Sequence, residues 1–370
     1  MTKNQFLKKI TEGTTEIFVF KNKDSAKGPG SKEKMPFFNP SMQLNRDFSI
    51  LVGQWLADKS RYEPVLLDGL AASGVRGVRF SNEIKGDFEV VINDINPDCF
   101  DLIKKNISSF KLKNTKAENK NLNVLLSEEK FDYIDVDPFG SPAYFVDSAI
   151  RSIKKEGIIA FTATDTAALC GVYPKVCLRR YAAVPFHSVV MKEVGLRILL
   201  GSICRSASKY DKAIEPLASY VTDHYFRVYV KIKKGAGRAN DSMKNLQVIK
   251  EGENIGYEKA KKDVGPLWMG KIHNKKFINE LRNLLFEKEL GTNKELLRLF
   301  DHLEGEANAP AFFYTNDSLS SFLKKSPLKV ETMIDKLKEQ NYLAIKTQFN
   351  PSGFKTDAPL EVIEKVFKQN

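Results

Sequence analysis

The tetrapeptide Asp137-Pro138-Phe139-Gly140 contains residue types that suit one particular chemistry. An exocyclic amine on an aromatic base is a poor nucleophile, because its lone pair is conjugated into the ring. The carboxylate of Asp137 can accept a hydrogen bond from one N–H of such an amine, and the carbonyl of Pro138 can accept the other. Phe139 can stack on the face of the base. Together these groups turn the lone pair toward an electrophile by positioning and electrostatics, so the chemistry needs no metal.

The position of this tetrapeptide in the chain favours the chemical interpretation. An isolated Asp-Pro pair is more often a turn or the entry to a helix. Here the pair follows residues 133–136, one of a series of expected strands that alternate with helices. The first three residues of the tetrapeptide, Asp137-Pro138-Phe139, resemble the [DNS]-P-P-[YFW] motif of amino-nitrogen methyltransferases. S-adenosylmethionine is therefore the expected methyl donor.

Two further loops predict a cofactor that carries a nucleoside. The first expected strand leads into a turn of small residues that begins with Asp68 and Gly69, and such a turn lets the backbone approach a ligand closely. Tight packing alone would also explain it. Asp94 follows the second expected strand and can accept both hydroxyls of a ribose, although it could instead cap a helix, a role open to Asn96 or Asp98.

These two loops do not distinguish NAD from S-adenosylmethionine. An NAD-dependent oxidoreductase has no evident use for the Asp-Pro-Phe motif. None of the four histidines has a catalytic setting, and we interpret all of them as structural or surface residues: His187, His224, His273 and His302.

The elements that must position these residues alternate between strand and helix. Short apolar runs predict strands at residues 65–67, 89–92, 122–126, 133–136 and 158–161, and helical patterns occupy 75–84, 97–110 and 142–154. Such alternation indicates an α/β, Rossmann-like methyltransferase domain with a mostly parallel sheet. The clean alternation of residues 225–232 predicts an antiparallel edge strand.

Outside this unit, the pattern predicts a strand at 16–20, a basic loop at 21–34 and helices at 45–59 and 189–208. Residues 235–265 are interpreted as a linker or a small hairpin. The expected domains are residues 1–265, catalytic, with an N-terminal extension (1–60) and a basic segment (175–238), and residues 266–370, a smaller α+β domain of a tRNA-binding type. In the latter, helices at 318–325 and 329–340, a strand at 342–347 and a loop at 348–357 fit a winged helix-turn-helix.

The charge distribution is compatible with a nucleic-acid partner. The chain has 58 Lys and Arg against 46 Asp and Glu, a formal net charge of +12, and residues 175–238 alone hold 13 against 4. Such a segment can bind phosphates, although a solvated basic surface is an equal alternative. The four cysteines form no C-x-x-C pair, and there is no signal peptide or long apolar run. We expect no metal, no membrane and a cytoplasmic location.

The chain resembles the archaeal branch of the tRNA (guanine-26-N2)-dimethyltransferase family over most of its length. The resemblance implies that one or two methyl groups are added to N2 of guanine 26 in tRNA, with Asp137 and Phe139 at the guanine. It also implies cofactor contacts from Arg46, Arg76, Asp94, Asn121 and Leu122. The stretches that carry it include Asn45-Arg-Asp47, Leu67 to Gly77, Asn93 to Pro97, Phe131 to Pro142, Gly265 to Gly270 and Phe354 to Pro359.

Two positions depart from the family pattern. The position of Asn121 is usually acidic, and residues 235–265 lack the four zinc-binding cysteines that some members carry there. The remaining alternatives are an amino-nitrogen methyltransferase acting on DNA, another RNA or protein glutamine, a non-catalytic RNA-binding protein, and a dinucleotide oxidoreductase. No obligate protein partner is evident.

Overall fold

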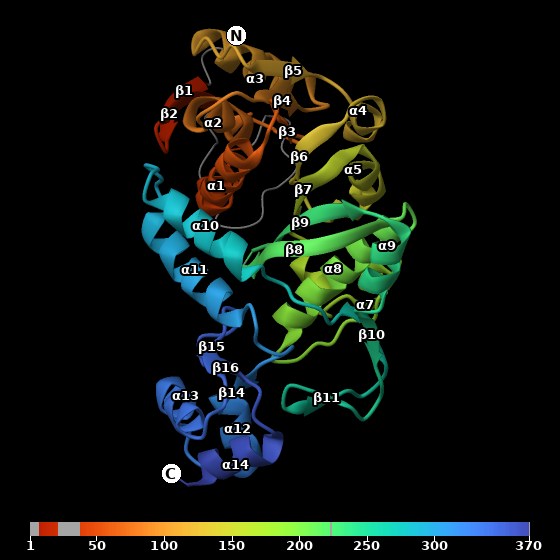
Figure 1. The fold of residues 1–370 in the computed structure, drawn as a ribbon, viewed down its shortest axis with the longest axis vertical. Helices are drawn as coiled ribbons and strands as arrows, with labels where there is room; N and C mark the ends of the chain where they lie inside the picture. Colours follow the sequence, from red (N-terminus) through yellow and green to blue (C-terminus); the bar gives the residue numbers. More distant parts are fainter. Residues whose placement is uncertain (1–6, 21–37, 223, 370) are drawn as a thin grey trace.

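The computed structural model describes residues 7–20, 38–222 and 224–369, so the basic loop at 21–34 lies outside the described residues (Figure 1). The central element is a seven-stranded sheet in the order β5-β4-β3-β6-β7-β9-β8. All neighbouring pairs from β5 to β7 are parallel, and β9 is antiparallel to both of its neighbours. This confirms the Rossmann-like α/β fold. In sheet order, the strands are Thr115–Glu118, Glu89–Asn93, Val65–Asp68, Phe131–Val136, Ile153–Ala163, Phe226–Lys234 and Lys212–Val221.

The strand expected at residues 122–126 is wrong, because this segment forms helix α4 (Leu122–Glu128). The Asn121 side chain caps it by accepting a hydrogen bond from the Asn123 N–H at 2.9 Å. Three leucines at helical spacing, Leu122, Leu125 and Leu126, are buried. A short apolar run of this kind fits either structure, and the cap favours the helix.

The antiparallel strand β9 was correctly expected, but it is not at the edge of the sheet. Strand β8 pairs with its outer side. The alternation in β9 was interpreted as one buried and one exposed face, yet Arg227 and Tyr229 are as buried as Phe226 and Val228. The polar face is buried because Arg227 forms an ion pair inside the protein. A buried charged residue therefore produces the same polar and apolar alternation in the sequence as an exposed residue would.

The helices cover both faces of the sheet. Helices α2 (Val75–Glu83) and α3 (Pro97–Ser109) match the predicted ranges closely, as do α1 (Gln43–Lys59) and α8 (Met191–Ser208). The helix expected at 142–154 is shorter, since α5 spans Val146–Ser152 and β7 begins at Ile153. The other elements of this part are β1 (Leu7–Glu12), β2 (Thr15–Phe20), η2 (Pro40–Met42), η3 (Pro142–Tyr144), α6 (Thr166–Leu169) and α7 (Pro174–Tyr181).

Helices α10 (Lys275–Leu285) and α11 (Asn293–Glu306) pack beside α1, although they follow it by more than 200 residues (Figure 1). Trp55 of α1 meets Phe277 of α10 with ring centroids 5.0 Å apart, and Phe48 meets Phe300 of α11 at 5.6 Å. These contacts belong to one hydrophobic core with part of the sheet. The domain boundary at residue 265 stays a prediction, and these two helices share the core of the first domain.

The segment 235–265 holds more structure than the expected linker. It forms helix α9 (Ala236–Met243), strand β10 (Leu246–Ile249) and a small hairpin of β11 (Asn254–Ile255) with β12 (Glu258–Lys259). Strand β10 pairs with β13 (Val264–Trp268). The hairpin was one of the two structures expected here. Among the described residues, no helix is long and apolar enough to span a membrane.

The C-terminal part contains the expected helix-turn-helix with a small sheet. The sheet has the order β14-β16-β15. This part of the protein has its own hydrophobic core, separate from the cores of the preceding residues. We refer to residues 314–368 as the winged module, which lies at the bottom of Figure 1. Its elements are β14 (Tyr314–Thr315), α12 (Asn316–Leu323), α13 (Val330–Glu339), β15 (Ala344–Lys346), β16 (Gly353–Thr356) and α14 (Leu360–Lys368).

A buried group of charges joins the winged module to the rest of the protein. Lys355 of β16 is 1% exposed, and its ammonium lies 2.7 Å from Glu193 of α8. Arg197 also binds Glu193, at 2.8 Å, and donates to the carbonyl of Trp268 at 2.7 Å. Glu306 of α11 accepts hydrogen bonds from Thr347 and from the Gln348 backbone of the module. We call Glu193, Arg197, Glu306 and Lys355 the junction cluster.

Candidate active site

The predicted site residues meet at the carboxyl ends of neighbouring parallel strands. Asp68 ends β3, Asp94 follows β4 and Asp137 follows β6. Because β3 lies between β4 and β6, the three carboxylates flank one edge of the sheet. In open α/β sheets this edge is where ligands bind.

Asp94 connects the first two loops of this edge. Its Oδ2 accepts a hydrogen bond from the Ala72 N–H and its Oδ1 accepts one from Asn96, both at 2.8 Å. The side chain of Asn96 caps α3, so the helix-cap interpretation of Asp94 is wrong. Each carboxylate oxygen retains a lone pair after these bonds, and the side chain is only half-buried. Asp94 can therefore still accept hydrogen bonds from a bound ligand.

Gly69 lies where three elements touch. Its N–H donates to the Asp135 carbonyl at 3.0 Å, and its own carbonyl accepts from the Asn93 side chain at 2.9 Å. A Cβ at this position would lie 2.9 Å from both the Asp135 carbonyl oxygen and the Leu122 side chain. A glycine is therefore required for β3, β6 and α4 to approach each other, and Leu122 lies directly beside the first loop.

Arg76 connects the expected cofactor loop to the expected catalytic loop. This residue of α2 is 5% exposed and donates hydrogen bonds to Asn45 (2.8 Å) and Ser49 (2.6 Å) of α1. Its terminal nitrogen also forms an ion pair with Asp137. Its Nε lies 3.5 Å from Asp135 and 3.9 Å from Asp68. The guanidinium thus contacts all three carboxylates, and a contact with the cofactor stays a prediction.

Asp135 and Arg227 were not predicted as site residues. Asp135 is fully buried, and Arg227 donates to both of its oxygens, at 3.0 and 2.6 Å. The hydroxyl of Tyr133 donates to it at 2.6 Å. Burial alone would raise the pKa of Asp135, but the charges of Arg227 and Arg76 lower it below its ordinary value. The available signal was the spacing of Asp135 in β6 and Asp137 directly after it, since alternate residues of an extended segment share a face.

The carboxylates of this edge outnumber its cations. Asp68, Asp135 and Asp137 face Arg76 and Arg227, which leaves one carboxylate in excess within this group, the site cluster. Burial raises the pKa of Asp68 to about 7. The positive charge of Arg76 lowers this pKa, and the negative charge of Asp135 raises it. The excess negative charge is therefore partly relieved by protonation of Asp68 near neutral pH.

The loop that follows Asp137 is fixed at its far end. The Gly140 N–H donates to the Thr164 hydroxyl at 2.7 Å, and the Thr164 N–H donates to the Gly140 carbonyl at 2.8 Å. Asp165 accepts a hydrogen bond from Tyr181 at 2.7 Å. Phe139 remains 54% exposed. The loop thus presents an aromatic ring on a fixed backbone beside the Asp137 carboxylate.

Arg46 lies in a neighbouring group of charges. It donates to both oxygens of Glu12, at 2.6 and 2.5 Å, and to the Asn39 carbonyl at 3.1 Å. Arg79 binds the same Glu12 at 2.7 Å and Asp47 at 2.6 Å. The structure does not bring Arg46 into contact with the site cluster, and its contact with a cofactor stays a prediction.

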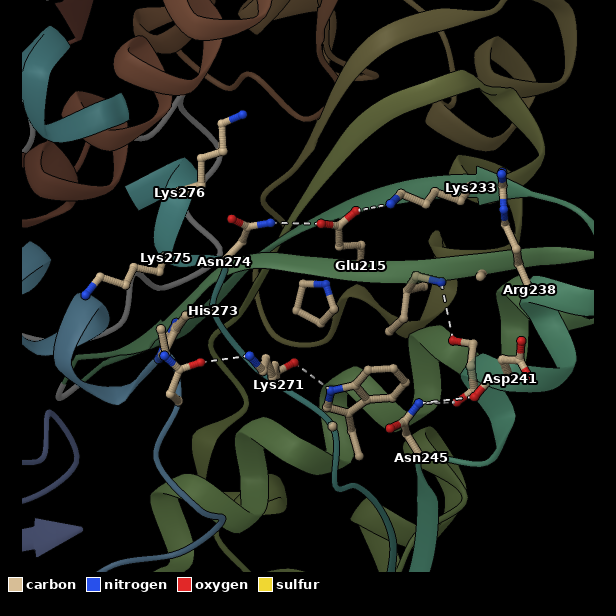
Figure 2. Close-up of a pocket in the computed structure, with 18 residues that line it drawn as sticks. Glu215, Lys233, Arg238, Asp241, Asn245, Lys271, His273, Asn274, Lys275 and Lys276 are labelled. Atoms are coloured by element: carbon tan, nitrogen blue, oxygen red, sulfur yellow. Dashed lines mark hydrogen bonds and ion pairs between the residues drawn. The ribbon is translucent and has the colours of Figure 1, made fainter. Parts of the chain in front are cut away.

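Two observations concern other parts of the molecule. No group of three or more possible metal ligands occurs among the residues that the structure describes, and the absence of a metal stays a prediction. A hollow of about 660 Å³ lies along β8, away from the carboxyl ends of the parallel strands (Figure 2).

A comparison with protein families identifies the family. A family model described as "N2,N2-dimethylguanosine tRNA methyltransferase" matches residues 17–368. The chain belongs to this family. Two members of the dimethylguanosine methyltransferase family match this chain over almost its whole length. A protein of Pyrococcus furiosus named tRNA (guanine(26)-N(2))-dimethyltransferase is 38% identical over 98% of both chains. One of the same name from Methanobrevibacter smithii is 35% identical over 98% of this chain and 97% of its own.

A solved structure has the same fold over almost the whole chain. The complex of Trm1 from Pyrococcus horikoshii with S-adenosyl-L-methionine superposes with a TM-score of 0.87 and 34% identity. The match covers 97% of this chain and 99% of that one. The resemblance stated from the sequence is therefore confirmed for family and fold.

Proposed function

We propose that this chain transfers methyl groups from S-adenosylmethionine to the exocyclic N2 of guanine 26 in tRNA, giving N2-methylguanosine and then N2,N2-dimethylguanosine. The observation that carries the proposal is the geometry of Asp137, which Arg76 holds through one oxygen beside the exposed ring of Phe139. The names of the full-length relatives give the substrate, and the Pyrococcus horikoshii complex gives the co-substrate.

The residues at the strand ends fit S-adenosylmethionine. The half-buried Asp94 has lone pairs for the two ribose hydroxyls, and the loop that begins at Asp68 and Gly69 consists mostly of small residues. The excess carboxylate of the site cluster favours a cation at this edge. When bound, the co-substrate supplies a methyl group on a positively charged sulfur. We propose further contacts from Arg46, Arg76, Asn121 and Leu122.

Three neighbouring residues act on the base. Among the described residues, none donates a hydrogen bond to Oδ1 of Asp137, so this oxygen can accept one N–H of the guanine amine. The Pro138 carbonyl accepts the other, and Phe139 stacks on the base. As the new N–C bond forms and the S–C bond breaks, Asp137 accepts the proton that N2 releases. Arg76 orients the carboxylate for this role through their ion pair.

The remaining parts of the protein act on the RNA. A base in a folded RNA must leave its stack to reach Asp137, at a cost of a few kcal/mol. We propose that the region beyond residue 265, with its winged module, supplies contacts that offset this cost. A cytoplasmic location fits such a substrate.

Methyl transfer to unmodified tRNA tests the proposal. Labelled S-adenosylmethionine is incubated with the protein, and the RNA is digested to nucleosides and identified. Asp137→Ala is assayed alongside, with Asp147→Ala as the matched control on the exposed side of α5. N2-methylated guanosine from the wild type and the control, but not from Asp137→Ala, supports the proposal. Label on another base overturns the substrate, and the absence of co-substrate binding overturns the reaction.

A further inference from the structure

The hollow along β8 is lined by basic side chains from separate segments (Figure 2). Lys233 belongs to β9 and Arg238 to α9, while Lys271, Lys275 and Lys276 lie at and just before the start of α10. In Figure 2, Arg238 and Lys276 lie on opposite sides of the hollow, with β8 between them. Distant parts of the chain thus bring five cations to one concave surface.

The acidic residues of the hollow are already engaged. Glu215 lies 2.6 Å from Lys233 and accepts a hydrogen bond from Asn274 at 2.9 Å. Asp241 lies 2.7 Å from Lys244, which is not part of the lining. Neither carboxylate is therefore available to neutralise the other cations of the hollow.

Three of the cations have no carboxylate partner among the described residues. Arg238 donates to the backbone carbonyl of Lys234 at 3.3 Å, and Lys271 donates to the amide oxygen of Asn308 at 2.8 Å. Lys276 has no polar partner among the described residues. All three are exposed, whereas Lys275 lies 3.4 Å from Glu304. The hollow therefore carries an uncompensated positive charge.

Two side chains that line the hollow, Trp268 and His273, are buried and add no charge. Trp268 and His273 are 4% and 2% exposed. Burial lowers the pKa of His273, so the imidazole is neutral at physiological pH. The hollow therefore combines exposed cations with buried, uncharged side chains, and this combination suits an anion that fits the hollow.

The hollow is far from the site cluster. Ala213 of its lining pairs with Lys233, while Val221 at the other end of β8 pairs with Phe226, next to the carboxyl end of β7. Eight residues of strand separate the two levels, or about 26 Å. An extended polyanion can span this distance, and a small co-substrate cannot.

We propose that this hollow binds phosphates of the tRNA backbone at a second point, remote from the methylated base. The inference rests on the proposed function, because that function supplies an RNA large enough to reach both places. Phosphate contacts fix the register of an RNA on a protein without reading its sequence. The hollow therefore helps to select the distance between the bound backbone and the target guanine.

The salt dependence of tRNA binding tests the proposal. The affinity for full-length unmodified tRNA is measured at several KCl concentrations for the wild type and for the double variant Arg238→Gln, Lys276→Gln. The slope of log K against log salt should become shallower by about 1.4 to 1.8, since each lost phosphate contact contributes about 0.7 to 0.9. The control, Lys104→Gln with Lys250→Gln, removes the same charge from exposed lysines elsewhere, and its slope should equal that of the wild type.

The other outcomes separate the hollow from the reaction. Equal slopes for the double variant and the wild type would overturn the proposal. The wild type could instead bind inorganic phosphate saturably and the double variant fail to do so, while the tRNA slope stays the same in both. That result would assign the hollow to a free anion and would also overturn the proposal. If the wild type does not methylate guanine in tRNA but the slope still falls in the double variant, the proposed function fails and the hollow remains an RNA-binding site.

Discussion

The site cluster and the junction cluster are both buried groups of charge, but they differ in balance. In the site cluster three aspartates face two arginines, and the side chain of Asp137 is 20% exposed. In the junction cluster Glu193 and Glu306 face Arg197 and Lys355, and the carboxylates are fully enclosed. A balanced, closed group can only hold elements together. An unbalanced group with an opening retains capacity for a ligand.

This difference predicts that substitutions in the two clusters have different effects. A change at the opening of the site cluster should affect the reaction and leave folding almost intact. A change in the junction cluster should affect folding first. The predictions below test this separation, in order of decreasing expected effect.

Asp137→Ala should lower kcat/KM for tRNA by about 10²- to 10⁴-fold, because the variant loses the acceptor for the amine proton. The midpoint of thermal unfolding should change little, since Asp137 is at the opening of its cluster. Steady-state kinetics and calorimetry on the same preparation check both parts. An unfolding midpoint far below that of the wild type would mean that Asp137 stabilises the fold, as the junction residues do.

Lys355→Met should destabilise the protein by about 3–5 kcal/mol, because it leaves a buried carboxylate without one of its partners. Urea unfolding measures the change. Lys346→Met is the matched control, since that lysine pairs with Glu331 at the surface and its loss should cost less than about 1 kcal/mol. Equal stability of the two variants would remove the distinction between the junction and an ordinary surface pair.

Phe139→Ala should bind S-adenosylmethionine normally while its activity falls by roughly 5- to 150-fold, the equivalent of a base-stacking contact of about 1–3 kcal/mol. Equilibrium binding and single-turnover methylation measure the two quantities. Phe286→Ala removes another exposed ring, on the C-terminal end of α10, and should be neutral. Normal turnover of the Phe139 variant would exclude its ring from the site.

Asp68→Asn should change the pH dependence of stability. The folded-state pKa of Asp68 is raised to about 7, so its stabilising contribution is complete below the ordinary value near 4 and is lost as the pH rises through 7. The wild type should therefore lose stability relative to the variant between about pH 4 and pH 7. Chemical unfolding across this range measures it, and parallel profiles would show that Asp68 is ionised throughout.

The sequence predicted the parts of the fold that depend on local pattern. Helix α1 and the strands around Asp68 and Asp137 follow directly from apolar spacing and short polar loops. The segment at 122–126 was misassigned because a brief leucine-rich run satisfies either periodicity, and only the capping bond of Asn121 selects the helix.

The candidate site was predictable where its residues are close in sequence. Asp137, Pro138 and Phe139 form one loop, and Asp94 stands at a position set by the fold. Arg227 could not be found in this way, because its partner Asp135 lies 92 positions earlier and only the pairing of β9 with β7 brings them together. The carboxylate partner of Arg46, Glu12, likewise comes from a separate hairpin.

The packing of α10 and α11 on α1 has a consequence for synthesis of the chain. Trp55 leaves the ribosome 222 residues before Phe277, its partner in the core. At translation rates of about 5–20 residues per second, the apolar side of α1 is made roughly 10–45 s before the helices that cover it, α10 and α11. During that interval the strands of the central sheet are synthesised while this apolar surface of the nascent protein stays exposed. This intermediate is therefore prone to aggregation until α10 and α11 have been made.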